Sequence, residues 1–187
     1  MKNTRSGVLA TLSIPTPLTI ETFDARRMLI LDNIGDLGEL GTVLRSASAF
    51  DWDAVWITHT CGDPFDPVCI RSSQGALFQL PYRVGSIENA LKHSRRSSGV
   101  LRLRYVHGSS GNVKMGLCDA HLTESQVRAS SGDVCLLIQK PHQSSPPTTD
   151  FKKVGVAGLT DSLSLPLSVS ASTLIYAIRD RYFSNTS

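Results

Sequence analysis

Short apolar runs alternate with segments of helical periodicity along this chain, and this alternation restricts its fold more than any other feature. Three runs have the length and composition of strands buried on both faces: residues 28–31 (MLIL), 54–58 (AVWIT) and 134–138 (VCLLI). Further strands are predicted over residues 101–106, with Arg102 and Arg104 on one face, and over residues 154–156. Helical spacing is found over residues 42–50, 70–80, 87–92 and 167–183. This order predicts an α/β domain with a mostly parallel sheet flanked by helices.

The composition excludes several classes of protein. Of 187 residues, 41% are hydrophobic and 19% are charged, which suits a globular domain and not a disordered chain. No apolar run approaches the roughly 20 residues of a membrane-spanning helix, so no membrane partner is expected. The four cysteines are scattered without a C-x-x-C pair, so no metal site is predicted. The net charge of +3 suits a polyanionic partner.

The first 20 residues differ in pattern from the rest of the chain. Residues 7–12 alternate as a strand does, and residues 14–17 (IPTP) predict an extended linker. We therefore expect an amino-terminal strand and linker over residues 1–20 and a single domain over residues 21–187. Lys2, Arg5 and the absence of acidic residues before residue 20 also resemble a mitochondrial presequence, which leaves the compartment open between mitochondrial matrix and cytoplasm, with the matrix favoured.

The loop over residues 32–45 is the place where we expect chemistry. It leaves the carboxyl end of a predicted strand and enters a helix, where open α/β sheets bind ligands. Gly35, Gly38 and Gly41 are expected to punctuate it, although it forms neither a G-x-G-x-x-G motif nor a P-loop. Taken alone, the composition of the loop favours a tight strand-to-helix turn, with Arg45 as an ordinary surface helix residue, over a ligand-binding loop.

Three segments, in order, resemble the SpoU/TrmH family of RNA ribose methyltransferases. Residues 31–47 (LDNIGDLGELGTVLRSA) are similar to the first family motif, L-D-x-I-x-D-P-G-N-L-G-T-I-L-R-T-A. Residues 63–81 (DPFDPVCIRSSQGALFQLP) resemble the family stretch D-P-x-x-P-x-x-x-R-x-S-x-G-A-x-F-x-x-P. Residues 164–176 (SLPLSVSASTLIY) resemble its third motif, S-L-N-V-S-V-A-A-A-I-L-L-Y.

The resemblance implies a SPOUT fold, which is a mostly parallel sheet with a carboxyl-terminal trefoil knot around which two chains pair. It implies S-adenosylmethionine as methyl donor and the 2′-hydroxyl of an RNA nucleotide as acceptor. The implied catalytic positions are Arg45, Glu39, Ser162 and Ser164. The implied cofactor contacts are Ile138, Gln139, Val154, Val156, Gly158, Leu163 and Leu165.

Four arginines are the predicted RNA contacts. Arg45 occupies the position at which family members bind the RNA backbone, and one interpretation is that this arginine also assists deprotonation of the ribose hydroxyl. Arg71 lies in the second matched segment. Arg95 and Arg96, in a basic loop, are replacement phosphate contacts, or else solvated surface charges.

The family motifs lose polar groups and glycines in this chain. Glu39 stands where relatives have asparagine, and an anion there repels phosphate unless Arg45 neutralises it. In the second motif, G-x-E-x-x-G, Gln139, Pro141 and Ser144 replace the first glycine, the glutamate and the last glycine, so that the Gln139 side chain intrudes on the cofactor's space. The asparagine of the third motif is absent as well.

These departures favour a SpoU/TrmH-like protein that binds RNA, ribosomal RNA or a ribosomal assembly intermediate, with catalysis impaired or lost and with no cofactor. The alternative is an active S-adenosylmethionine-dependent ribose 2′-O-methyltransferase of rRNA or tRNA. The expected assembly is a homodimer, or a heterodimer with a related SPOUT chain that keeps the active groups.

Overall fold

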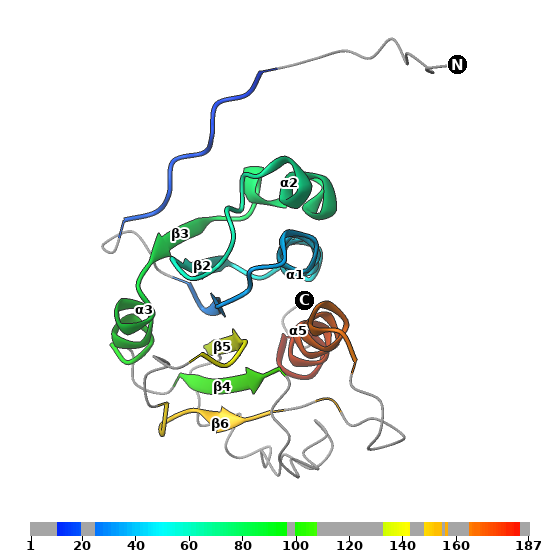
Figure 1. Ribbon diagram of the computed structural model, residues 1–187. Coiled ribbons are helices and arrows are strands. Elements are labelled where there is room, and N and C mark those ends of the chain that lie inside the picture. The colour runs from blue at the N-terminus through cyan, green and yellow to red at the C-terminus, as the bar shows by residue number, and fades with distance from the viewer. Residues whose placement is uncertain are drawn as a thin grey trace.

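The computed structural model describes residues 11–19, 25–96, 100–107, 133–142, 148–154, 156 and 165–183. Six parallel strands form one sheet in the order β3-β2-β1-β5-β4-β6 (Figure 1). The strands are β1 (Arg27–Asp32), β2 (Ala54–Thr58), β3 (Tyr82–Gly85), β4 (Leu101–Val106), β5 (Val134–Gln139) and β6 (Lys152–Lys153). The predicted α/β class with a parallel sheet is confirmed, whereas the predicted knot involves residues outside the described ranges and stays a prediction.

Helices cover both faces of the sheet (Figure 1). On one face, α1 (Leu37–Ala49) packs against α2 (Pro67–Ser73) and against α5 (Leu167–Phe183). The other face carries α3 (Ile87–Ser94). The predicted helix over residues 167–183 is confirmed, and the side chains of Ala171, Leu174, Ile175 and Ile178 are buried against β1, β4 and β5. No helix among the described residues is long and apolar enough to cross a membrane.

The first helix starts earlier than its hydrophobic spacing predicts. Asp36 caps it by accepting the backbone N–H of Glu39 at 2.7 Å, so Gly38 and Gly41 lie inside α1 and not in a loop. Gly41 is required by the packing, because a methyl group at this position would overlap the Ser72 hydroxyl of α2 and lie 2.6 Å from the Cys69 carbonyl oxygen. The glycine therefore serves the close approach of two helices.

Other boundaries also differ from the prediction. The helix expected over residues 70–80 is divided, since α2 ends at Gln74 and Gly75, both left-handed, and a 3-10 turn follows over Ala76–Phe78. β3, too short and polar to be recognised in the sequence, was not predicted. The strand expected over residues 154–156 is wrong: the strand is β6, and Val154 follows it with its N–H bonded to the Arg104 carbonyl oxygen.

The amino-terminal segment lies along β3. Among its described residues, 11–19, there is no helix or strand, and the part of the predicted strand before residue 11 lies outside the described ranges. The segment is fixed by Tyr82 Oη, which donates to the Pro15 carbonyl at 2.6 Å, and by Arg83 Nη1, which donates to the Leu18 carbonyl at 2.7 Å. Residues 14–17, the end of β2 and the loop after it line a pocket of about 650 Å³.

Candidate functional site

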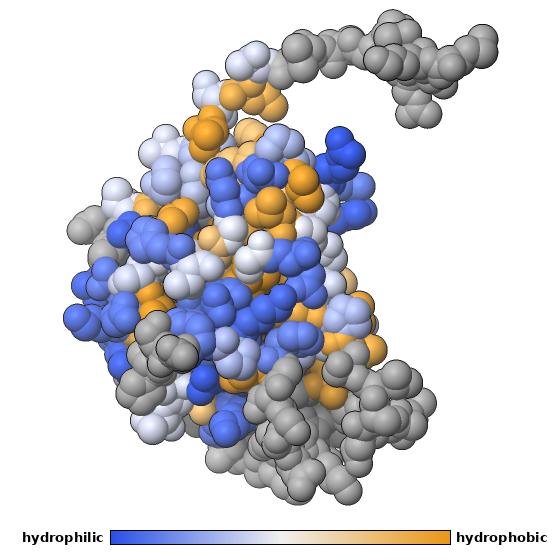
Figure 2. Space-filling view, in the orientation of Figure 1, coloured by the Kyte–Doolittle hydropathy of each residue, from blue (hydrophilic) through white to orange (hydrophobic). Residues whose placement is uncertain are grey.

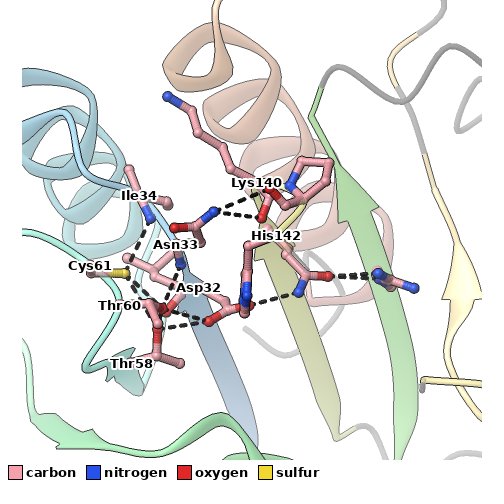
Figure 3. A network of polar contacts seen from close by, with 12 residues as sticks. Asp32, Asn33, Ile34, Thr58, Thr60, Cys61, Lys140 and His142 are labelled. Carbon is pink, nitrogen blue, oxygen red and sulfur yellow. Dashed lines mark hydrogen bonds and ion pairs between the residues drawn. The ribbon is translucent and has the colours of Figure 1, made fainter. Parts of the chain in front are cut away.

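The site is built around Asp32, at the carboxyl end of β1 (Figure 3). Its carboxylate is fully buried and accepts four side-chain contacts. Thr58 and Thr60, at and just after the end of β2, donate to Oδ1 at 2.8 and 2.9 Å. Gln139 Nε2 lies 2.7 Å and His142 Nε2 3.2 Å from Oδ2. A buried carboxylate is tolerated because every one of these groups compensates for the water it has lost.

Gln139 connects Asp32 to Arg104. It lies opposite Asp32 in the register of β1 and β5, and its side chain is 1% exposed. Its Oε1 accepts from Arg104 Nε at 3.1 Å and from Arg104 Nη2 at 2.7 Å, while its Nε2 donates to Asp32. Burial lowers the pKa of the Arg104 guanidinium, and the Asp32 charge opposes that shift. The amide thus lies between a fully buried carboxylate and a half-buried guanidinium.

The loop after β5 is tied to the loop after β1 (Figure 3). Asn33, which is left-handed at φ 56°, donates through Nδ2 to the carbonyl oxygens of Lys140 at 3.2 Å and Pro141 at 3.3 Å. Cys61 completes the cluster: its thiol donates to the Leu31 carbonyl at 3.3 Å, and burial raises its pKa. The residues that follow β5 are consequently held against β1 and β2.

Glu39 joins three elements. Its Oε2 lies 2.6 Å from Lys140 Nζ, after β5, and its Oε1 accepts the backbone N–H of Leu167, the first residue of α5, at 3.2 Å. Glu39 also lies in the first turn of α1, so two helix amino termini stabilise one carboxylate. From the sequence, we expected Arg45 to neutralise the Glu39 carboxylate, but in the structure Lys140 forms the ion pair with it.

Arg45 and Arg71 are exposed on α1 and α2, and neither forms an ion pair with a described residue. Arg45 lies one turn beyond Gly41, the residue at which α1 meets α2. Next to Arg45, the Ser46 hydroxyl contacts the Ser172 hydroxyl of α5 at 2.7 Å. The structure therefore places both arginines on the helical layer formed by α1, α2 and α5.

Comparison with known proteins decides the family. The model of the SpoU rRNA Methylase family matches residues 26–138, which is more than half of the chain and includes β1 to β4 and β5 up to Ile138. The chain belongs to the SpoU rRNA methylase family. This confirms the resemblance drawn from the three sequence motifs.

Individual relatives are similar over parts of their length. A tRNA/rRNA methyltransferase of Synechocystis, described as uncharacterised, is 40% identical over 75 residues, 40% of this chain and 27% of that protein. The mitochondrial rRNA methyltransferase 3A of Danio rerio is 41% identical over 85 residues, 42% of this chain and 19% of that protein. The chain thus spans about a quarter or less of the curated relatives it matches.

A solved structure supports the fold. The SpoU methyltransferase AviRb of Streptomyces viridochromogenes, in complex with its cofactor AdoMet, aligns with a TM-score of 0.65 over 91% of this chain and 61% of that one, at 21% identity. At this identity the likeness concerns the fold alone.

Only some of the residues that the resemblance to the SpoU family assigns to the cofactor lie together in the structure. Ile138 is buried toward α1 and α5, whereas Gln139, the next residue of β5, points to the other face with Asp32. Val154 is buried, Val156 packs on the same core as Ile138, and Leu165 is 40% exposed before α5. Ser162, Ser164, Gly158 and Leu163 lie outside the described residues.

Arg95 and Arg96 are not brought to Arg45. They follow α3, on the face of the sheet opposite α1 (Figure 1). Arg95 is already held by Asp150, with Nε and Nη2 at 2.9 and 2.7 Å from its two carboxylate oxygens.

Sequence reasoning missed the centre of the network. Asp32, Thr58, Thr60 and His142 were not singled out, although Asp32 and Thr58 end two apolar runs that had been recognised as strands. Carboxyl ends of parallel strands meet at one edge, so polar residues at those ends were the available signal. Among the described residues, no group of three or more His, Cys, Asp or Glu side chains is arranged to hold a metal ion.

Proposed function

We propose that this chain is an RNA-binding member of the SpoU family, acting on ribosomal RNA or a ribosomal assembly particle, with methyl transfer impaired or lost. The family supplies the RNA partner, and the exposed Arg45 and Arg71 supply cations for the phosphate backbone.

The proposed loss of catalysis rests on one observation: the side-chain amide of Gln139 is held in place by hydrogen bonds to two other residues. The SpoU motif has glycine at this position, where the backbone leaves room beside the methyl donor. In this chain the buried amide is fixed by Asp32 at one end and by Arg104 at the other. Moving it aside would leave the buried Asp32 carboxylate and the half-buried Arg104 guanidinium without their common partner, at a cost of about 1–3 kcal/mol. The carboxyl end of β5 therefore fits S-adenosylmethionine poorly.

Glu39 supports the same proposal. The family asparagine lies near the acceptor ribose, whereas both oxygens of Glu39 are engaged by Lys140 and the Leu167 N–H. A carboxylate that anchors α5 is not available to orient a ribose hydroxyl. By this argument Glu39 has exchanged a catalytic role for a structural one.

The test combines two measurements on the purified chain. Fluorescence anisotropy with ribosomal RNA fragments measures binding, and transfer of a labelled methyl group from S-adenosylmethionine to the same RNA measures catalysis. We expect binding without transfer, and no heat on titration with millimolar S-adenosylmethionine. Arg45→Gln should weaken RNA binding several-fold, whereas Arg179→Gln, an exposed arginine on α5, serves as its control.

Methyl transfer by the unmodified chain would overturn the loss of catalysis and establish the alternative, an active ribose 2′-O-methyltransferase that uses S-adenosylmethionine. A chain that does not bind RNA would overturn the proposal as a whole.

The proposed assembly is a dimer, with a second copy or with a related SPOUT chain that retains the catalytic groups. The heterodimer is proposed because Gln139 no longer fits as a cofactor contact and Glu39 no longer fits as a catalytic residue, so that a partner chain would have to supply these groups. Size-exclusion chromatography with light scattering tests it: a stable homodimer of the isolated chain would remove that motive, and a monomer would support it.

The proposed compartment is the mitochondrial matrix, and the mitochondrial relative from Danio rerio supports it. Fractionation of cells that express the full-length protein tests this location. A purely cytosolic signal would contradict it.

A further inference from the structure

Five cations gather where the end of α3 meets β4 and β6, and we call this group the basic edge: Lys92, Arg95, Arg96, Arg102 and Lys153. Lys92 lies in the last turn of α3, and Arg95 and Arg96, which directly follow the helix, are three and four residues after it, so each lies near Lys92. Lys153 pairs with Arg104 in the register of β6 and β4, so it faces the same side of the sheet as Arg102.

Asp150 holds the basic edge together. Its two oxygens receive Arg95 Nε and Nη2 at 2.9 and 2.7 Å, and Arg102 Nε lies 3.9 Å from Oδ2. Arg102 also donates from Nε and Nη2 to the Ser94 carbonyl, the last residue of α3, at 3.1 and 2.9 Å. The neighbouring Phe151 is buried and fixes the turn that carries Asp150. Cations from three elements are thus set in a defined arrangement.

The charge of this surface is unbalanced. Asp150 forms ion pairs with two of the five cations, Arg95 and Arg102. The other three, Lys92, Arg96 and Lys153, are exposed without an ion-pair partner in the described part of the chain. Figure 2 shows hydrophilic side chains over this α3 side of the molecule.

The basic edge is separate from the site around Asp32. Lys92, Arg95, Arg96 and Arg102 lie around the end of α3 and the amino end of β4, and Lys153 lies farther along the sheet, in register with Arg104. Asp32 and Gln139, by contrast, end their strands at the carboxyl edge. Arg45 lies on α1, across the sheet from α3 (Figure 1). An RNA that engages the basic edge is consequently held at a distance from the family's catalytic positions.

We propose that the basic edge is a second RNA-docking surface, which grips the phosphate backbone without reading sequence. This inference rests on the proposed RNA binding and adds to it the surface that anchors the RNA. Exposed lysine and arginine side chains release counterions from a phosphate backbone on binding, so each contact contributes to the salt dependence of the affinity. Fixed guanidinium groups such as Arg95 and Arg102 keep the strip positive, while the flexible Lys92, Arg96 and Lys153 reach the phosphates.

The experiment measures binding of a labelled single-stranded RNA to the full chain by anisotropy over a series of KCl concentrations. The test variant is the triple substitution Lys92→Gln, Arg96→Gln and Lys153→Gln, which leaves Arg95, Arg102 and Asp150 in place. Arg96→Gln is compared with Arg179→Gln, since each removes one exposed arginine, the first just after α3 and the second on α5. Circular dichroism melts establish that all variants are folded.

We expect Arg96→Gln to reduce the slope of log affinity against log salt by about 0.7 and the triple variant by about 2, because each lost phosphate contact contributes about 0.7 for a single strand. Arg179→Gln should leave the slope unchanged. If the unmodified chain binds RNA and the triple variant binds it with the same affinity and slope, the inference is wrong while the proposed RNA binding stands.

Two further outcomes are decisive. If the unmodified chain does not bind RNA, the proposed function fails and the docking surface fails with it. If polyglutamate competes as strongly as RNA at equal charge, the surface is a site for acidic protein segments, and the RNA assignment is overturned.

Discussion

Contact with neighbouring residues can decide which residue type a position in this chain accepts, even against the intrinsic helix propensity of that residue. Glycine inside a helix normally destabilises it by about 0.5–1 kcal/mol relative to alanine. At Gly41 the sign should reverse, because an added methyl group meets the Ser72 hydroxyl and backbone atoms of α2 that cannot move independently. We predict that Gly41→Ala lowers the free energy of unfolding by about 1–3 kcal/mol.

Urea denaturation of the purified chain checks this prediction, with Gly35→Ala as the matched control. Nothing lies within 4 Å of a methyl group at Gly35, so that variant should be close to neutral. Equal stabilities of the two variants would mean that α1 and α2 are not in contact at Gly41.

Asp150 gives one residue-scale effect of pH. Hydrogen bonds from Arg95, aided by the charges of Arg95 and Arg102, hold the pKa of the Asp150 carboxyl below its ordinary value of 3.8. A group whose pKa is lowered by folding stabilises the fold fully above its unfolded pKa, and that contribution disappears as the pH falls through the lowered value. Because the side chain is 32% exposed, the contribution is about 0.2–1 kcal/mol.

Asp150→Asn should therefore be less stable than the unmodified chain at pH 7 by about that amount. The difference should shrink as the pH falls below about 3.8 and vanish below the lowered pKa. Urea denaturation at several pH values measures it, and a difference that stays constant across this range would contradict the ion pair as its cause.

At the scale of elements, the sequence predicted which helices and strands are present better than it predicted where they begin and end. The helix over residues 167–183 and the strand over residues 54–58 agree with α5 and β2 because their apolar pattern extends to their ends. The start of α1 was missed, since its first turn is formed by capping at Asp36 and not by apolar residues. The site around Asp32 could not be predicted from the sequence either. Asp32 and Gln139 are buried by neighbours from other strands, and the pattern of residues along one strand does not show those neighbours.

The end of α2 carries a testable strain. Gln74 has φ 52° and ψ 36°, the left-handed conformation that glycine adopts without cost and other residues adopt at about 1 kcal/mol. Gln74→Gly should stabilise the fold by about 0.5–1 kcal/mol in thermal or urea denaturation. Gly75→Ala, at φ 74°, is the reverse substitution and should destabilise it by a similar amount. If Gln74→Gly is less stable than the unmodified chain, the contacts of the Gln74 side chain stabilise the fold by more than the left-handed backbone conformation destabilises it.

At the scale of the whole molecule, strand order was the part that the sequence did not reveal. Apolar runs identify buried strands without saying which of them are neighbours. In the sheet, β5 lies between β1 and β4, although many residues separate it from both.

The central position of β5 predicts the reactivity of its cysteine. Cys135 is 1% exposed, and burial raises the pKa of its thiol to about 12; burial, with Asp66 and Asp63, raises that of Cys69 to about 11. Only the thiolate is alkylated readily, so both should resist iodoacetamide at pH 8 until urea unfolds the sheet. Peptide mapping by mass spectrometry reports each site, and rapid labelling of Cys135 without urea would contradict a closed sheet.

The late arrival of β5 also has a consequence for biosynthesis. β1, β2 and β3 are complete once residue 85 has been translated, but one side of β1 has no neighbouring strand until residues 134–139 leave the ribosome. During that interval an apolar strand edge is open to incorrect pairing, and closing it requires contacts over a long sequence separation, which slows folding. The nascent chain is therefore most exposed to aggregation, and most in need of a chaperone, while the stretch between β4 and β5 is being synthesised.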